Sequence, residues 1–135
     1  EKPTDDATLQ GVTILLAEDN DLNLEIAQFL LENAGATVTA ARNGQEAVDI
    51  FAASRPGEFD AILMDVMMPV MDGYTATRTI RRLDRPDAGH IPILATTANA
   101  FAEDRRRAYE AGMNEHLTKP LETELVIKML AKYRK

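Results

Sequence analysis

The 135-residue sequence lacks cysteine and tryptophan, and no apolar run in it approaches the length of a membrane span. Without cysteine, the chain has no disulfide, no thiolate metal site and no cysteine nucleophile, and this fits a reducing compartment. A helix that crosses a bilayer needs roughly 20 consecutive apolar residues. We therefore expect a soluble, cytoplasmic chain that makes no direct contact with a membrane.

A basic excess is also missing, because 15 lysine and arginine residues face 22 aspartate and glutamate residues, for a net charge of −7. Nucleic-acid binding relies on a positive surface that attracts phosphates, so we expect no nucleic-acid partner. What is present, a hydrophobic share of 45% with charges of both signs, is typical of a globular chain. One domain with a substantial core is expected at this length.

Composition divides the chain into a short polar start and a repeating region. The stretch EKPTDDATLQG has few large apolar residues, so we predict a linker over 1–11 and one domain over 12–135. The predicted strands are 12–17, 37–41, 60–65, 91–97 and 115–119. Helical patterns follow each of them, at 22–33, 43–54, 74–83, 102–111 and 122–132. Five such units imply a parallel sheet with helices on both faces.

Residues at helical spacing mark the side of each helix that we expect to be buried. In the first helix they are Leu22, Ile26, Phe29, Leu30 and Asn33. In the second they are Ala47, Ile50 and Phe51, after an Asn43 and Glu46 pair with the spacing of a capping box. In the last they are Leu125, Met129 and either Lys132 or Tyr133.

Polar side chains stand where four of the predicted strands end. Glu18 and Asp19 follow the first strand, and Asp65 ends the third. The fourth strand ends in Thr97 and the fifth in Lys119. In open parallel sheets, sites form outside the carboxyl ends of the strands, at the point where the strand order reverses. We therefore expect these five residues to converge in one crevice.

The chemistry of this set follows from its charges. Three carboxylates a few ångströms apart repel one another, so at neutral pH they take up protons or bind a cation. Oxygen ligands without histidine or cysteine suit a hard cation, and a shallow site with few protein ligands favours Mg²⁺ over Ca²⁺. Lys119 and Thr97 add a positive charge and a hydroxyl, a combination that stabilises a transferring phosphoryl group. Asp65 is then the candidate nucleophile, because carboxylates form aspartyl phosphates.

Four stretches at these strand ends resemble the motifs of one family, the receiver domains of two-component response regulators. LLAEDN is similar to the acidic-pair motif, ILMDVMMPVMDG to the phosphoacceptor motif, PILATTANA to the hydroxyl motif and GMNEHLTKP to the lysine motif. The resemblance covers about Val12 to Tyr133. It implies an α/β fold of the (βα)5 flavodoxin-like type, with a five-stranded parallel sheet of order 2-1-3-4-5 and helices on both faces.

The resemblance also implies roles for the acidic residues. Asp65 would accept a phosphoryl group from a phosphohistidine. Glu18 and Asp19 would hold Mg²⁺ together with Asp65 and the backbone carbonyl of Met67, with Asp19 as the more direct acidic ligand of the pair.

The other motif residues have implied roles as well. Thr97 would swing toward the phosphoryl group, Lys119 would pair with its oxygens, and Ala98 is small enough to leave the group accessible. The Lys119–Pro120 peptide bond would be cis, at the cost of roughly 0.5–1 kcal/mol that is peculiar to X–Pro bonds.

Two residues depart from the usual pattern of the family. His116 stands where many members have a tyrosine or phenylalanine as a switch residue coupled to Thr97, and histidine is smaller and titrates near neutral pH. Met67, two residues after Asp65, has a side chain that cannot hydrogen-bond an attacking water. We expect hydrolysis of the aspartyl phosphate not to be assisted from position 67.

The stretches PVMDGYTATRTIRRL and ATTANAFAEDRRRAYEAGMNEHLTKPL are most similar to receivers fused to hybrid sensor histidine kinases. We expect the chain to be the C-terminal receiver of such a kinase, and the kinase could tether the receiver to the inner membrane. The receiver domain itself is expected to be a phosphoacceptor rather than a conventional enzyme. Its expected partners are a histidine kinase core and a histidine-phosphotransfer domain, docking near 21–26 and after Lys119. Phosphorylation would change the contacts made by 105–107 and 116–121; without such a role, the arginines at 105–107 would be a solvated face. We expect a monomer or a weak dimer.

Other functions compete with this one. An aspartyl-phosphate hydrolase has an Asp-x-Asp pair whose second acid donates a proton, and Met67 takes that place. A flavin-binding carrier shares the topology but needs a loop that binds phosphate, whereas AEDNDLN would repel one. A stand-alone response regulator and a receiver-fold interaction module that is not phosphorylated are the remaining alternatives, although such a module has no need for the full set of acids, hydroxyl and lysine.

Overall fold

The computed structural model describes residues 9–98, 102–119 and 121–133, and its strands form one five-stranded sheet. The strands are β1 (Thr13–Ala17), β2 (Thr37–Ala41), β3 (Ala61–Asp65), β4 (Ile93–Thr97) and β5 (Glu115–Thr118). Neighbouring strands are parallel and follow the order β2-β1-β3-β4-β5. The predicted fold class and strand order are confirmed.

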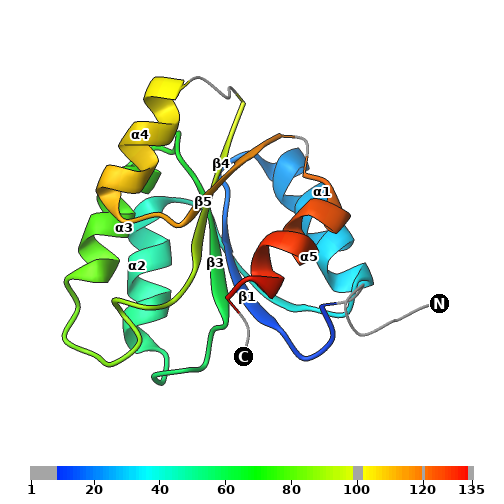
Figure 1. Cartoon of the computed structure of the whole chain (residues 1–135), viewed down its shortest axis with the longest axis horizontal. Helices are drawn as coiled ribbons and strands as arrows, with labels where there is room; N and C mark the ends of the chain where they lie inside the picture. The colour runs from blue at the N-terminus through cyan, green and yellow to red at the C-terminus, as the bar shows by residue number, and fades with distance from the viewer. Residues whose placement is uncertain (1–8, 99–101, 120, 134–135) are drawn as a thin grey trace.

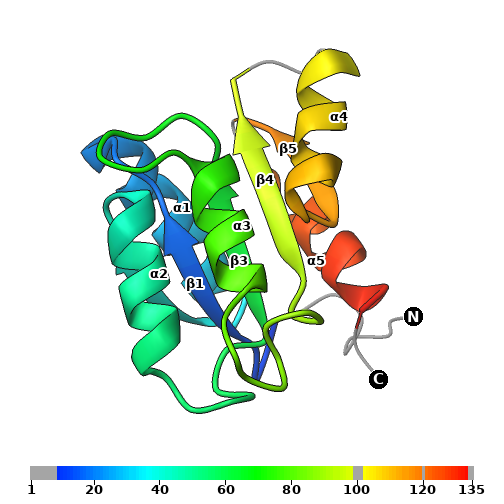
Figure 2. The same ribbon diagram turned by 90° about the vertical axis from the view of Figure 1, so that its left-hand side faces the viewer.

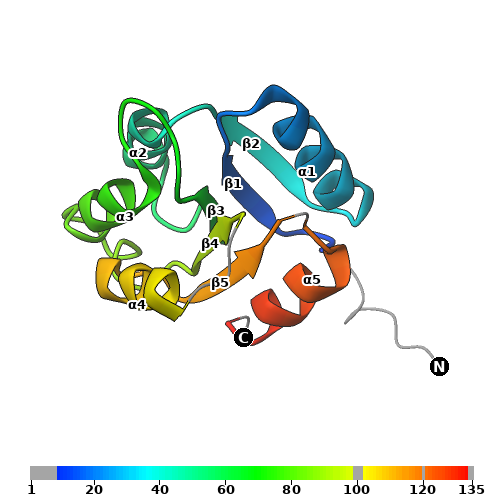
Figure 3. The ribbon, with the colours of Figure 1, turned by 90° about the horizontal axis from the view of Figure 1, so that it is seen from above.

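A helix follows each strand in the chain. The helices are α1 (Asp21–Asn33), α2 (Gly44–Ala53), α3 (Gly73–Arg81), α4 (Ala102–Ala111) and α5 (Thr123–Ala131). Helices α1 and α5 cover one face of the sheet, and α2, α3 and α4 cover the other (Figure 1). The view from above shows the sheet between these two layers of helices (Figure 3). Among the described residues, no helix combines the length and the hydrophobicity of a transmembrane span.

A hydrophobic core lies on each face of the sheet, because successive residues of a strand point to opposite sides. In β3, Ile62 and Met64 pack in the core beneath α2, α3 and α4, whereas Leu63 packs in the core beneath α1 and α5. Every residue of β3 is buried, as expected for a central parallel strand that is covered on both faces. The place of Asp65, the last residue of β3, is therefore set by packing on both sides of the sheet.

Polar caps begin three of the helices close to the ends of strands. Asn20, Asn43 and Asp72 are the N-caps of α1, α2 and α3, and each side chain accepts a hydrogen bond from the backbone N–H three residues later. At α2 the carboxylate of Glu46 accepts from the backbone N–H of Arg42 and not from that of Asn43. The predicted cap at Asn43 is thus present, but the reciprocal half of the capping box is displaced by one residue.

The buried side of α1 is not the predicted one. Leu22, Ile26 and Phe29 are 64%, 47% and 67% exposed. The residues that α1 buries against the sheet are Leu24, Ala27 and Leu31. Both sets fit a 3.6-residue period, so periodicity alone could not choose between them. The prediction of the buried stripe was therefore wrong, and α1 presents an apolar surface to solvent.

Helix α5 shows a similar shift of the buried stripe. Val126 and Leu130 are its buried residues, whereas the predicted Leu125 is 38% exposed. The predicted Met129 is partly buried and packs against the core, so the prediction is displaced by one residue at Leu125 only. Because a step of one residue turns the helix by about 100°, this small displacement changes which side chains face the core.

Packing against the core begins before the predicted end of the linker at residue 11. Leu9 is only 1% exposed and lies in the core beneath α1 and α5. Its backbone N–H donates to the carbonyl of Ala34, 2.8 Å away, and its own carbonyl accepts from Val12. The rest of the predicted linker, 1–8, lies outside the described residues.

Candidate functional site

Four strands deliver polar side chains to the same edge of the sheet, where their carboxyl ends meet. The arrowheads of β1 and β4 point to this end of the molecule (Figure 2). Parallel pairing brings Asp65 of β3 beside Thr96 of β4, and Thr97 beside Thr118 of β5. Lys119 follows directly, and its backbone N–H donates to the carbonyl of Thr97 at 2.8 Å. Pro120 lies outside the described residues, so the predicted cis bond before it stays a prediction.

The three predicted acids converge at this edge. Carboxylate oxygens of Glu18, Asp19 and Asp65 all lie within 4.8 Å of one another. Glu18 and Asp65 are buried, at 4% and 3% exposure, whereas Asp19 faces solvent. The Glu18 carboxylate also accepts from the backbone N–H of Asn20 at 3.1 Å. The cluster therefore combines two buried oxygen donors with one that is open to solvent.

Lys119 lies between the two buried acids. Its Nζ is 2.8 Å from Oε1 of Glu18 and 3.0 Å from Oδ2 of Asp65. The lysine side chain is 22% exposed, so this ammonium group is largely withdrawn from water. A single positive charge is thus shared by two buried carboxylates, which leaves the acidic cluster with an excess of negative charge.

The pKa values of the pair reflect this crowding. Burial and the negative charge of Glu18 raise the pKa of Asp65 to about 6, although the hydrogen bond from Lys119 acts to lower it. Burial alone would lower the pKa of Lys119, but hydrogen bonds to Glu18 and Asp65 outweigh that effect and raise it above its ordinary value. A carboxylate held in this way favours a second cation beside it.

The loop after β3 holds Asp65 in place. The backbone N–H of Met67 donates to Oδ1 of Asp65 at 3.2 Å, and the Met67 side chain is 76% exposed. Val70 has a φ of 68°, within a tight turn closed by the Met71 N–H and the Pro69 carbonyl at 2.6 Å. Positive φ is rare for a β-branched residue, and such conformations gather at functional sites.

Gly73 permits the close return of this loop to the end of β3. A Cβ atom at position 73 would lie 2.3 Å from the carbonyl oxygen of Asp65. The backbone N–H of Gly73 donates to the carbonyl of Val66 at 3.1 Å. Only glycine fits here, so the glycine of the MDG stretch lets α3 begin directly against Asp65, the predicted nucleophile.

An open cavity of about 760 Å³ lies beside the acidic cluster. On the side of the cluster it is lined by Asp19, Met67, Thr97 and Ala98, and on the side of α3 and α4 by Asp72, Tyr74, Asp104 and Arg107, with Val66, Met68 and Pro69 between them. Thr97 is 4% exposed, whereas Ala98 is exposed. Of the predicted site residues, Asp19, Met67, Thr97 and Ala98 thus border this open space.

His116 lies on the same face of the sheet as Thr97. It pairs with Ala95 of β4, and Thr97 is two residues further along that strand. Both ring nitrogens are buried and find no hydrogen-bond partner among the residues that the structure describes. Burial lowers the pKa of His116, the positive charge of Arg105 lowers it further, and Asp104 opposes both. The ring is therefore held neutral.

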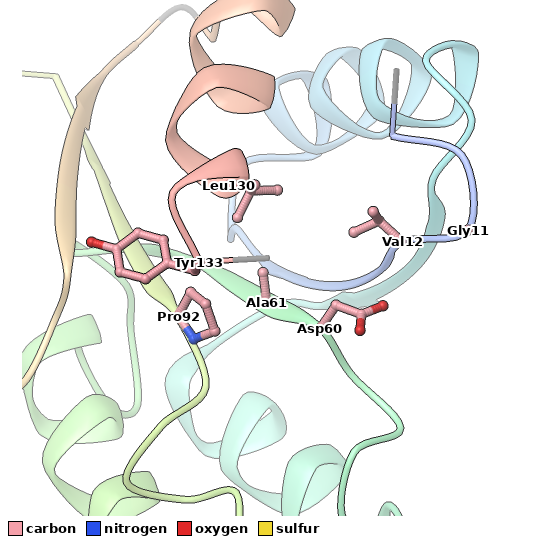
Figure 4. Close-up of a pocket in the computed structure, with 7 residues that line it drawn as sticks. All are labelled: Gly11, Val12, Asp60, Ala61, Pro92, Leu130 and Tyr133. Atoms are coloured by element: carbon pink, nitrogen blue, oxygen red, sulfur yellow. The ribbon is translucent and has the colours of Figure 1, made fainter. Parts of the chain in front are cut away.

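A second cavity lies at the opposite end of the sheet and has different chemistry (Figure 4). Its volume is about 300 Å³, and it is lined by Gly11, Val12, Asp60, Ala61, Pro92, Leu130 and Tyr133. The carboxylate of Asp60 accepts from the backbone N–H of Thr13 at 2.8 Å, and the Tyr133 hydroxyl donates to Glu115 at 2.7 Å. These polar groups are therefore engaged in hydrogen bonds within the fold. The acids and the lysine that suit phosphoryl chemistry lie at the carboxyl edge of the sheet instead.

Several residues that line the larger cavity were not predicted as site residues, among them Tyr74 and Arg107. These two come from α3 and α4, and the guanidinium carbon of Arg107 lies 4.6 Å from the centre of the Tyr74 ring. In the sequence Arg107 belongs to an arginine run that reads as a solvated face, and Tyr74 reads as a helix residue. No local sequence pattern relates two positions so far apart, because their contact depends on how α3 packs against α4.

Comparison with known proteins gives a consistent result. The family model for the response regulator receiver domain matches residues 14–131. The chain is 39% identical to Histidine kinase 1 of Arabidopsis thaliana, an alignment that covers 89% of this chain and 12% of the kinase. It is also 39% identical to Sensor protein GacS of Pseudomonas syringae pv. syringae, covering 89% of this chain and 13% of that protein. The chain thus spans only a small part of the length of these relatives.

Solved structures agree with this relationship. The receiver domain of sensor histidine kinase PA1611 from Pseudomonas aeruginosa PAO1, crystallised with a magnesium ion in its active-site cleft, has 40% identity and a TM-score of 0.81, with 91% of this chain and 97% of that chain covered. The co-crystal of Saccharomyces cerevisiae Ypd1 with the Ssk1 receiver domain gives 30% identity and a TM-score of 0.77, with 90% and 88% covered. The chain therefore belongs to the response regulator receiver domain family of two-component signalling, and it is homologous to the receivers of hybrid histidine kinases.

Proposed function

We propose that the domain accepts a phosphoryl group on Asp65 from the phosphohistidine of a histidine kinase core or a histidine-phosphotransfer domain. The observation that carries this proposal is the convergence of Asp65 with Lys119, Glu18 and Asp19 at one edge of the sheet. A carboxylate oxygen of Asp65 forms the new bond to phosphorus while the P–N bond to the imidazole breaks. The electron pair leaves with the imidazole, which takes a proton from solvent.

The donor set of the acidic cluster fits Mg²⁺. Glu18, Asp19 and Asp65 offer carboxylate oxygens within 4.8 Å of one another, and hard cations prefer such ligands. These three residues, with the backbone carbonyl of Met67, would hold the ion. When bound, Mg²⁺ supplies positive charge that offsets the acids and the phosphoryl oxygens. The magnesium ion of the related PA1611 receiver supports this assignment.

The other site residues would act on the phosphoryl group itself. Lys119 already touches Asp65, so its ammonium group can follow the negative charge from the carboxylate to the phosphoryl oxygens. The Thr97 hydroxyl, at the border of the cavity, would donate to the same group, and His116 would move with it as the switch residue. Ala98 leaves the entrance open. Phosphorylation would break the contacts of Lys119 with Glu18 and Asp65, and this would change the conformation of the loop after β5.

The exposed side of α1 is the proposed docking surface for the phosphodonor protein. Leu22, Ile26 and Phe29 form an apolar surface, and contiguous surfaces of this kind mark interaction sites. A narrow pocket of about 60 Å³, bordered by Ile26, Lys119 and Leu121 among others, joins this surface to the site. The co-crystal of Ypd1 with the Ssk1 receiver shows that a receiver of this fold binds a histidine-phosphotransfer protein.

The experiment for this proposal follows a radiolabel from phosphorylated Ypd1 to the chain. The native chain should gain the label, and Asp65→Asn should not. Asp49→Asn removes an exposed acid of α2 and should behave as the native chain does. Equal labelling of Asp65→Asn would place the acceptor elsewhere.

We further propose that the domain works in the cytoplasm as part of a larger histidine kinase, as expected from its sequence.

A further inference from the structure

The far wall of the large cavity carries a positively charged residue, Arg107. Arg107 stacks on Tyr74, with 4.6 Å between the guanidinium carbon and the ring centre, and the Tyr74 ring is only 6% exposed. The hydroxyl of Tyr74 is directed to the carbonyl of Asp104 at 3.5 Å. A buried, anchored aromatic ring restricts the arginine that lies on it. Arg107 is an exposed residue, and its contact with Tyr74 keeps the guanidinium group at the wall of the cavity.

The charges of the cavity make this arginine distinctive. Its described lining includes three acids, Asp19, Asp72 and Asp104, and Arg107 is the only positively charged residue among them. Asp72 already caps α3 through the backbone N–H of Thr75. An anionic donor that enters this space meets repulsion from the acids, and Arg107 is the lining group that can attract it.

The geometry of phosphoryl transfer sets the direction in which the leaving group departs. The attacking and leaving oxygens lie roughly in line on opposite sides of phosphorus. Asp65 is 3% exposed, and Lys119 and Glu18 close the side toward α1. A group that leaves opposite to Asp65 must therefore move outward. Asp65 does not itself line the cavity, but the cavity is bordered by Val66 and Met67, which follow Asp65 in the chain, and by Thr97 and Arg107.

We propose that Arg107 binds the leaving carboxylate of small acyl phosphates and so favours them as phosphodonors; this rests on the proposed function of Asp65 as the acceptor. In the step, the Asp65 carboxylate forms a bond to phosphorus and the bond from phosphorus to the carboxyl oxygen breaks. The electron pair leaves with the carboxylate, and no proton is transferred. The planar guanidinium group suits this product because it can bind both carboxylate oxygens at once.

The identity of the leaving group provides the test. Acetyl phosphate releases acetate, which gains a full negative charge, whereas phosphoramidate releases neutral ammonia. The rate of phosphorylation is measured by intact mass with each donor for the native chain, Arg107→Gln and Arg107→Lys. Arg106→Gln is the matched control, because Arg106 is an exposed residue of the same helix that does not line the cavity. Thermal unfolding of each variant shows that it is folded.

We expect Arg107→Gln to slow the reaction with acetyl phosphate about 3- to 10-fold, the effect of removing one charge from a hydrated site. Its rate with phosphoramidate should stay within about 1.5-fold of the native rate, because no charge develops for Arg107 to stabilise. Arg107→Lys keeps the charge but loses the two-point contact with the carboxylate, so it should retain only part of the acetyl phosphate rate, whereas Arg106→Gln should retain all of it.

Three outcomes would overturn the inference. If Arg107→Gln slows both donors equally, the arginine acts on the phosphoryl group or on the fold. If it slows neither, Arg107 does not contact the donor. In both cases phosphoramidate still labels Asp65, and the proposed function stands. If neither donor labels the native chain, the proposed function fails together with the inference.

Discussion

Nζ of Lys119 lies 3.0 Å from Oδ2 of Asp65, although 54 positions separate the two residues in the sequence. The lysine also touches Glu18, so one positive charge serves two buried acids. One ammonium group does not fully compensate two buried carboxylates, and the pKa of Asp65 stays raised at about 6. The site is therefore maintained at some expense of stability.

Removal of the Asp65 charge should stabilise the chain in the absence of Mg²⁺. Burial raises the pKa of Asp65 from 3.8 to about 6, so the folded state binds the proton more tightly than the unfolded state. The stability that this provides is complete below about pH 4 and is lost as the pH rises through 6. Asp65→Asn should raise the free energy of unfolding by about 1–3 kcal/mol at pH 8 and change it little at pH 4. Urea unfolding at both pH values measures this.

Asp87 offers a control of opposite sign. Burial acts to raise its pKa, but the hydrogen bonds from Arg85 and from the backbone of Gly57 outweigh it and lower the pKa. That stability is present above the ordinary pKa of 3.8 and is lost as the pH falls. Asp87→Asn should therefore destabilise the chain at pH 8 and less so in acid. The same pH trend for both variants would contradict the assigned electrostatics.

His116→Phe should stabilise the chain, and more so in acid. The two buried ring nitrogens have no partner among the described residues, and unsatisfied polar groups cost about 1–3 kcal/mol. Burial also lowers the pKa of His116 from 6.5, so protonation of the unfolded chain removes stability as the pH falls below that value. The advantage of His116→Phe should grow from pH 7.5 to pH 5. Thermal melts check this, with His90→Gln, an exposed histidine, as control; an advantage that does not change with pH would contradict it.

The two sides of α1 should respond differently to substitution. Leu24 is 4% exposed and Phe29 67% exposed. Leu24→Ala should lower the free energy of unfolding by about 2–4 kcal/mol, because it empties a packed position. Phe29→Ser should change it by less than about 0.5 kcal/mol but slow phosphotransfer from phosphorylated Ypd1. Urea unfolding and the transfer rate separate the two effects, and a large loss of stability in Phe29→Ser would contradict the assignment of this side as a surface.

Much of the site could be predicted because the polar residues that suit its chemistry stand at the predicted strand ends. Glu18, Asp65, Thr97 and Lys119 stand at the ends of aliphatic runs, and parallel strands bring such ends together. Their convergence therefore follows from the alternation of strands and helices alone. The magnesium ligands and the phosphoacceptor role remain predictions that rest on this geometry and on the family.

Other features could not be predicted because several placements satisfy the same local pattern. In α1 the sets that contain Leu24 and Phe29 both have helical period, and only the three-dimensional packing decides which is buried. Leu9 follows a polar stretch, yet it packs beneath α1. The contact of Tyr74 with Arg107 depends on how α3 and α4 lie against each other, which neither segment specifies alone.

The most direct test of the central claim is the intact mass of the chain after incubation with acetyl phosphate, with and without Mg²⁺. The chain has no tryptophan, so mass is a better readout than fluorescence. The native chain should gain one phosphoryl group when Mg²⁺ is present, and Asp65→Asn should gain none. No gain in the native chain with Mg²⁺, or the same gain in Asp65→Asn, would contradict the assignment of Asp65 as the phosphoacceptor.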